Sequence, residues 1–441
     1  MTGQVETGTV EQPVKFSQRV ERSMPVLLMI WLLLGVLAPH QDTYKAFFYL
    51  LMVPAGLILL CSGRAQINWK DPLLLIALVF FAYAGITTFI VGLGPVESHL
   101  RALRWSVEIT FGLIALFLWM PVVVYKPERW GYFFLLVALI GSVAAILMFV
   151  FYFQLKGRLT GLGVENPIQI SSILLIYFAI GQYLLNRYSG HLSWRGKALL
   201  LAALFAVSLA VLLSKSRAPI VAMLVYFLFL GIMILLNRPT RGAVYTVIAL
   251  VAGVVLILFL IQHFYGIEKY TEGLIRKGFS HRIEIWTAYI FYPPESILLG
   301  AGAGTPPEFH PAAEGYWQSI NEYPRHPHNL ILGTFVDTGI IGLVFLSALA
   351  FLVFRAIIKH PSTIGEGIGL FGIVGLIFML TLTGSQTVIS SIKAIWLFFW
   401  VPVVFIWFWC RYNDKSAAPE VNKALEGTDK LTEVRRQLPN E

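Results

Sequence analysis

Two histidines and an arginine stand before an apolar run in the stretch YPRHPHN, residues 323–329. Histidine exchanges protons near neutral pH, so His328 is a candidate general base. Arg325 and His326 are candidate phosphate or acceptor contacts. Asn329 is expected at the entry of the following helix, as a candidate acceptor contact or supporting residue. The His-x-His spacing could also supply two metal ligands, but no recognised zinc spacing completes the set. We therefore predict that this stretch holds no metal.

Cations also occupy two other short connections. LLSKSRAPIV places Lys215 and Arg217 within a few residues of each other, and LKGRLTGLGVENP contains Arg158. In the second stretch Asn166 is expected to cap a helix that begins at Pro167. Cations held in tight turns can bind a phosphate group. The alternatives are snorkelling to lipid phosphates for the first stretch, and a flexible loop before a helix for the second.

A third basic stretch, GFSHRIEIWTAY, has helical spacing. Arg282 and Trp286 lie one turn apart on one face, and His281 stands near the helix start. Trp286 and His281 are candidate acceptor contacts or supporting residues. The arginine fork suits a phosphate, and the indole could stack on a sugar or on the guanidinium. The alternative is an amphipathic helix whose arginine binds lipid headgroups.

The elements that must position these side chains are membrane helices. Of the 441 residues, 57% are hydrophobic and only 13% are charged, whereas soluble domains have about a quarter charged residues. We expect an all-α polytopic membrane protein with about twelve spans of near-bilayer length. Their centres are near Leu32, Leu51, Phe81, Gly112, Val143, Leu174, Phe205, Phe227, Gly253, Phe345, Gly375 and Val401.

The distribution of lysine and arginine predicts the orientation. Short cytoplasmic loops retain positive charge, so the N-terminal segment with Lys15, Arg19 and Arg22 is assigned to the cytoplasm, as is the C-terminus. The opposite loops hold fewer cations, and these are Lys45, Arg101, Arg104, Lys156, Arg158, Lys215, Arg217 and Lys393.

We expect five segments along the chain. These are a cytoplasmic segment at 1–23, nine membrane helices over 24–263, and a long periplasmic loop with amphipathic helices at 264–328. They are followed by three more membrane helices over 329–410 and a cytoplasmic tail at 411–441.

A glycine-rich motif, GAGAGT, lies in the long loop. It lacks the Gly-Lys-Ser/Thr ending of a nucleotide-binding P-loop, so we interpret it as a glycine-rich turn.

The order of these features resembles the bacterial O-antigen ligase and polymerase superfamily. The resemblance rests on the connector Ser216-Arg217, the helix Ser280-His281-Arg282 with Trp286, the turn Gly300-Ala301-Gly302 and the entry His326–Asn329. It implies a metal-independent, inverting membrane glycosyltransferase of the C type, which needs no cofactor. Its site would lie at the periplasmic face of the inner membrane.

The resemblance also implies substrates and roles. An O-antigen glycan would move from undecaprenyl diphosphate to a sugar hydroxyl of the lipid A core. His328 would act as the base, with Arg217 and Arg282 as the diphosphate clamp. Lys215 and Arg158 are added as candidate clamp residues because of their placement alone.

Several other functions remain open. The chain length, the single moderate outer loop and the small C-terminal tail favour a ligase over an O-antigen polymerase or a protein O-oligosaccharyltransferase. A lipid-linked glycan flippase is the non-enzymatic alternative, but apart from Asp337 and Glu108 few intramembrane acids could form an ion pathway. The net charge of +9 is spread over both faces, which favours membrane lipids over nucleic acid as partners.

Overall fold

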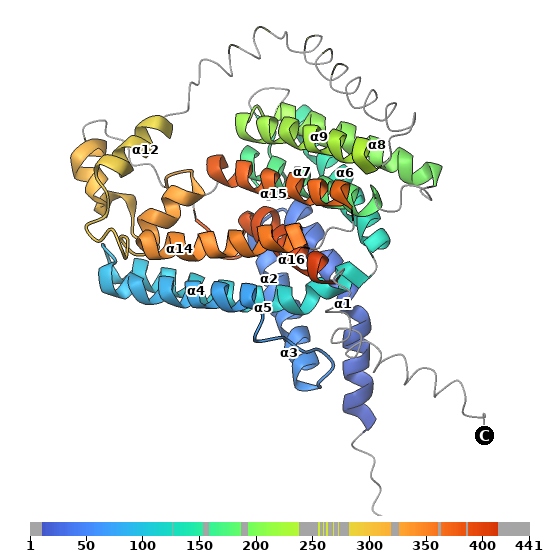
Figure 1. The fold of residues 1–441 in the computed structure, drawn as a ribbon, viewed down its shortest axis with the longest axis horizontal. Coiled ribbons are helices and arrows are strands. Elements are labelled where there is room, and N and C mark those ends of the chain that lie inside the picture. The colour runs from blue at the N-terminus through green and yellow to red at the C-terminus, as the bar shows by residue number, and fades with distance from the viewer. Residues whose placement is uncertain are drawn as a thin grey trace, which may run out of the picture.

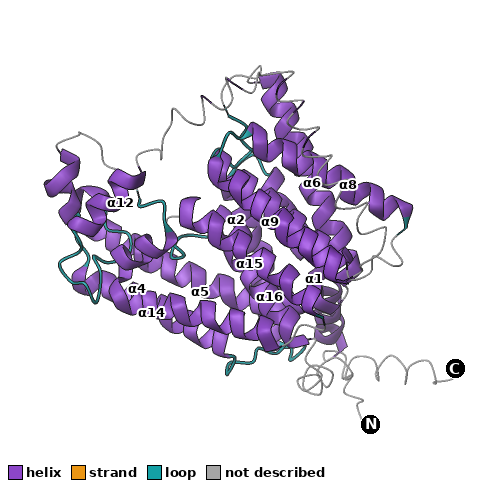
Figure 2. Cartoon of the chain, turned by 45° about the horizontal axis from the view of Figure 1, so that its top comes forward, coloured by secondary structure: helices purple, strands orange, loops and turns teal. Residues whose placement is uncertain are grey.

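The computed structural model describes residues 11–125, 127–152, 158–186, 193–237, 282–318, 326–359, 363–384 and 387–412, with a few isolated positions between 255 and 272. Throughout these ranges the regular elements are helices joined by loops (Figures 1 and 2). They are α1 (Glu11–Leu37), α2 (Gln41–Phe47), η1 (Phe48–Met52), α3 (Val53–Cys61), α4 (Pro72–Val91), α5 (Val96–Tyr125), α6 (Pro127–Tyr152), α7 (Pro167–Asn186), α8 (Trp194–Leu213), α9 (Arg217–Asn237), α12 (Arg282–Phe291), η2 (Pro307–Phe309), η3 (Ala313–Trp317), α14 (Leu330–Lys359), α15 (Ile364–Gly384), η4 (Trp396–Trp400) and α16 (Val401–Tyr412).

The membrane-spanning architecture predicted from composition is confirmed. Within the described ranges, ten helices are long and apolar enough to cross a bilayer, and a shorter apolar helix covers Trp396–Arg411. The expected span centred near Gly253 lies outside the described residues. The chain is a polytopic all-α membrane protein.

Helix α7 forms the centre of the bundle. Its residues from Ile170 to Leu185 are all buried, and it packs against α6, α8, α9 and α15. Asn166 accepts a hydrogen bond from the backbone N–H of Ile168 (2.9 Å), and Pro167 is the first residue of the helix. The predicted cap and helix start are therefore confirmed.

Asp71 links the start of α4 to the last helix of the bundle. Its carboxylate accepts the backbone N–H groups of Leu73 (2.9 Å) and Leu74 (3.2 Å), as an N-cap does. Its other oxygen accepts from Trp407 Nε1 (3.0 Å) and Arg411 Nη1 (2.5 Å) on α16. The buried carboxylate is thus fully partnered, which joins α4 to α16.

Helix α14 is broken near its start, and a loop occupies the break. Gly339 has φ 65° and ψ −162°, a conformation that is strained for residues with a Cβ. The N–H of Ile340 therefore donates outside the helix, to the carbonyl of Ile297 (3.0 Å). A Cβ at Gly339 would lie 2.2 Å from the carbonyl oxygen of Leu298.

The glycine-rich turn predicted at Gly300–Thr305 lies against this break. Gly300 has a positive φ, and a Cβ there would lie 2.6 Å from the backbone nitrogen of Gly339. The carbonyl of Ala303 accepts a hydrogen bond from Thr88 Oγ1 near the end of α4 (3.2 Å). The turn therefore joins α4 to α14 at the end of the bundle that also carries α12, on the left in Figure 1.

Candidate active site

Arg158 is fixed to the turn between α8 and α9. Its Nε donates to the carbonyl of Ser214 (3.0 Å), and its Nη2 donates to Ser216 Oγ (2.5 Å). Arg217, the next residue along the chain, is the first residue of α9. Two arginines from separate connections are therefore placed beside one turn.

This turn has a defined and unusual backbone. Lys215 has φ 51°, in the left-handed region that non-glycine residues rarely adopt. Ser214 Oγ accepts the N–H of Ser216 (3.2 Å) and donates to the carbonyl of Val211 (2.7 Å). No role was predicted for Ser214, and Ser216 was named only as part of the Ser216-Arg217 connector. Their Ser-x-Ser spacing in a short connector was the available signal, since serine hydroxyls stabilise such turns.

Arg282 brings a third guanidinium group to the same place. It is the first residue of α12. Burial lowers the pKa of Arg282, and the charges of Arg217 and Arg158 lower it further. Three arginines from three connections are thus close enough to repel one another, and a bound anion would relieve this repulsion.

Trp286, one turn after Arg282, holds the backbone before α14. Its Nε1 donates to the carbonyl of Pro327 (2.8 Å). Asn329 Oδ1 accepts from the N–H groups of Ile331 (3.0 Å) and Leu332 (3.1 Å), so its predicted place at the helix entry is confirmed. Contact of Trp286 or Asn329 with an acceptor remains a prediction.

His328 lies between these two fixed points. Its φ is 52°, and a non-glycine residue in this region often marks a functional site. The imidazole of His326 lies alongside, with 3.9 Å between ring centroids. In the described part of the chain, Nδ1 of His328 is buried without a hydrogen-bond partner.

The surroundings of His328 keep its imidazole neutral. Burial lowers its pKa to about 4, and the charge of Arg282 contributes to the decrease. At neutral pH the ring can therefore accept a proton. An anion bound to Arg282 would offset that charge and raise the pKa of His328, making it a stronger base.

The structure thus brings together Arg158, Arg217, Arg282, His326 and His328, with Lys215 in the adjoining turn. The predicted residues Arg325 and His281 lie outside the described residues. Across the described ranges, no group of three or more His, Cys, Asp and Glu side chains could hold a metal ion. Metal independence stays a prediction.

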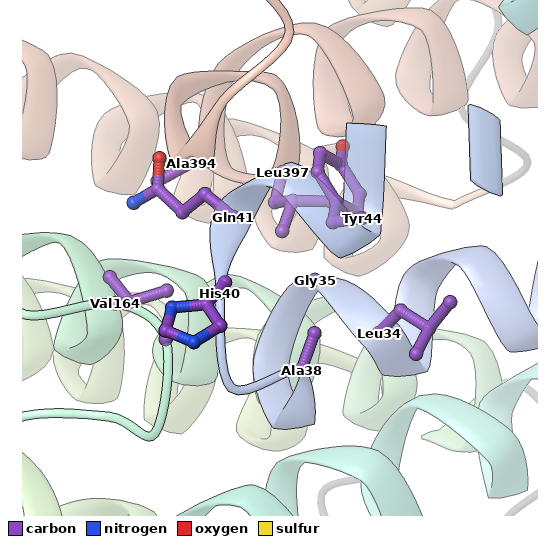
Figure 3. A pocket seen from close by; sticks show the side chains of 10 residues that line it. Leu34, Gly35, Ala38, His40, Gln41, Tyr44, Val164, Ala394 and Leu397 are labelled. Atoms are coloured by element: carbon purple, nitrogen blue, oxygen red, sulfur yellow. The ribbon is translucent and has the colours of Figure 1, made fainter. Parts of the chain in front are cut away.

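A cavity lies beside the loop that follows Arg158. It is small, with an enclosed volume of about 10 Å³, room for about one water molecule. Figure 3 shows the side chains of His40 and Gln41, from the α1–α2 corner, close to Val164 of that loop. The complete lining is Leu34, Gly35, Ala38, His40, Gln41, Tyr44, Gly163, Val164, Ala394 and Leu397.

Fold and geometry together define a polytopic helical membrane protein with clustered arginines and a neutral histidine at one end of its bundle. Residues 201–347 match the family model described as O-antigen ligase. This segment is about a third of the chain and contains Arg217, Arg282 and His328. Residues 201–347 are therefore similar to the O-antigen ligase family, and the predicted resemblance is confirmed over this segment. Comparison with curated proteins and with solved structures gave no significant match.

Proposed function

We propose that the protein is an O-antigen ligase of the bacterial inner membrane. It transfers O-antigen glycan from undecaprenyl diphosphate to a sugar hydroxyl of the lipid A core at the periplasmic face. One observation carries the proposal: Arg158 bonds to Ser216 beside Arg217, the charges of both arginines act on Arg282, and the charge of Arg282 acts on His328. The family match supports a membrane glycosyltransferase, and the clustered positive charge supports a diphosphate-linked donor.

The proposed reaction is a single displacement. His328 removes the proton from the acceptor hydroxyl as its oxygen attacks the anomeric carbon. A new glycosidic C–O bond forms while the C–O bond to the diphosphate breaks, and the electron pair leaves with the diphosphate. Attack opposite the leaving group inverts the anomeric centre. The proton on His328 then passes to solvent or to the released lipid diphosphate.

The arginines stabilise the leaving group in this scheme. Negative charge grows on the diphosphate during the transition state, and guanidinium groups already in position lower its energy. Arg217 and Arg282 form the clamp. Arg158 adds charge and holds the Ser214–Ser216 turn through its two hydrogen bonds, and Lys215 is a further candidate contact.

Reconstituted transfer tests the proposal. Purified protein in nanodiscs is given lipid-linked glycan together with lipid A core, and the products are separated. Glycan attached to lipid A core supports a ligase, whereas elongated lipid-linked glycan indicates a polymerase and glycosylated protein indicates an oligosaccharyltransferase. Movement of the donor across the bilayer without covalent product indicates a flippase. EDTA should leave transfer unchanged, and loss of transfer restored by divalent metal would contradict metal independence.

His328→Ala tests the assigned base directly. This variant should bind the lipid-linked donor as the wild type does but transfer no glycan. His99→Ala is the matched control, because His99 is on the same predicted outer side and packs against Phe89. Normal transfer by His328→Ala would remove this histidine from the mechanism.

A further inference from the structure

A second group of cations lies outside the candidate active site. Arg104 and Lys393 are exposed and Lys45 is half-buried; they come from α5, the segment before η4, and α2. Gln41, one turn before Lys45, and Ala394, directly after Lys393, line the same cavity, and Arg104 pairs with Glu108. The charges of Glu108, Lys393, Asp42 and Arg104 also act on Lys45, so these five side chains belong to one neighbourhood. We name Lys45, Arg104 and Lys393 the second cation cluster.

The cluster is partly neutralised by carboxylates. Arg104 Nε contacts Glu108 Oε1 at 2.9 Å, with side-chain exposures of 68% and 14%. Asp42 is exposed on the same helix as Lys45. Three cations facing two acids leave a positive excess, and the exposed guanidinium of Arg104 can contact a further anion beyond Glu108.

Buried aromatic side chains hold these cations in place. Tyr44, directly before Lys45, is buried in the core. The backbone N–H of Trp396 donates to the backbone carbonyl of Lys393 (2.9 Å). The Trp396 ring packs so closely on α5 that a Cβ at Gly112 would lie 2.4 Å from it. The cluster therefore stands on rigid elements.

The cavity of Figure 3 brings sequence neighbours of this cluster together with the loop that follows Arg158. Gln41, one turn before Lys45, and Ala394, directly after Lys393, line it on one side. Gly163 and Val164 line it on the other, in the loop that follows Arg158. All of these segments lie on the predicted outer side, where loops retain few cations.

We propose that the second cation cluster binds phosphate groups on the headgroup of the acceptor glycolipid. The proposal rests on the proposed function, because that function makes a membrane-anchored glycolipid of the lipid A class the acceptor. Ammonium and guanidinium groups on the predicted outer side are complementary to phosphomonoesters on its saccharide. Phosphate bound there would hold the acceptor on the predicted outer side, next to the loop that follows Arg158.

The test combines acceptor binding and transfer. The variant Lys45→Gln, Arg104→Gln, Lys393→Gln is placed in nanodiscs of zwitterionic lipid. Acceptor affinity is measured for lipid A core and for the same glycolipid after phosphatase treatment. Each cation near an anionic headgroup contributes about fivefold, so the variant should bind the phosphorylated acceptor about a hundredfold more weakly. The KM for this acceptor should rise similarly, with kcat little changed.

A charge-matched control removes three cations from the predicted cytoplasmic side, through Lys70→Gln, Arg195→Gln and Lys197→Gln. It should bind both acceptors as the wild type does. Equal wild-type affinity for both acceptors, or an equal loss on both in the cluster variant, would overturn the proposal. Equal competition by phosphatidylglycerol would also overturn it, by showing a general anionic-lipid surface. Phosphate-dependent binding without any transfer would count against the ligase function alone.

Discussion

The hydrogen bond from Trp286 Nε1 to the Pro327 carbonyl (2.8 Å) positions the peptide that precedes His328. We predict that removing this donor slows transfer without weakening donor binding. A buried carbonyl left without its partner costs about 1–3 kcal/mol. The left-handed backbone of His328 is itself unfavourable by roughly 1–2 kcal/mol, so the released peptide can turn and move the imidazole. A displaced imidazole is poorly aligned with the acceptor hydroxyl, and this should lower kcat by about tenfold to a hundredfold.

The sharpest perturbation replaces Trp286 by 3-benzothienylalanine, in which sulfur substitutes for the indole N–H at nearly constant shape. Single-turnover transfer and equilibrium donor binding are measured on the same preparation. The analogue should lower the transfer rate while donor affinity stays within about twofold, because the diphosphate contacts are unaffected. Trp194 is exposed on the predicted opposite side, and the same replacement there is the control. An unchanged transfer rate in the Trp286 analogue would refute this positioning role.

Three further predictions concern the clamp, the break in α14 and a buried histidine. Arg282→Lys keeps the charge but loses the planar fork, so donor affinity should fall about tenfold in a binding assay. Gly339→Ala places a methyl group 2.2 Å from the Leu298 carbonyl and should cost about 2–4 kcal/mol in thermal unfolding, whereas Gly375→Ala, with no atom within 4 Å, should be nearly neutral. Burial lowers the pKa of His310 from 6.5 to about 4, so between these pH values the unfolded chain binds a proton that the folded chain does not. Stability should therefore fall on acidification, by about 3 kcal/mol at pH 4. His310→Phe keeps the ring contact with Tyr289 and should remove the loss of stability that His310 causes at low pH. If the pH dependence of unfolding were the same in this variant as in the wild type, the prediction for His310 would be wrong.

Local chemistry explains what the sequence could predict about the fold. Apolar runs of bilayer length identify membrane helices, because each span must satisfy its own backbone hydrogen bonds in lipid. Asn166 and Asn329 mark helix starts because their side-chain oxygens accept the first free N–H groups. The break at Gly339 was not predicted, since it depends on backbone contacts with the distant residues Ile297 and Leu298.

The candidate site was predicted residue by residue, whereas its geometry was not. An arginine in a short outer loop is a recognisable signal, because lysine and arginine are normally enriched in the cytoplasmic loops. The convergence of Arg158, Arg217 and Arg282 depends on the packing of helices far apart in the chain. The left-handed conformation of His328 and the Trp286 bond to the preceding peptide also arise only in the folded chain, so no local pattern could indicate them.

The central claim is that one site gathers the diphosphate clamp and the catalytic base. A cryo-electron microscopy structure of the protein in nanodiscs with undecaprenyl diphosphate tests it most directly. The account predicts that the diphosphate lies between Arg217 and Arg282, with phosphate oxygens within about 4 Å of both guanidinium groups, and that His328 faces the phosphate end where the sugar would be attached. Diphosphate bound away from these arginines, or with His328 directed away from it, would contradict the account.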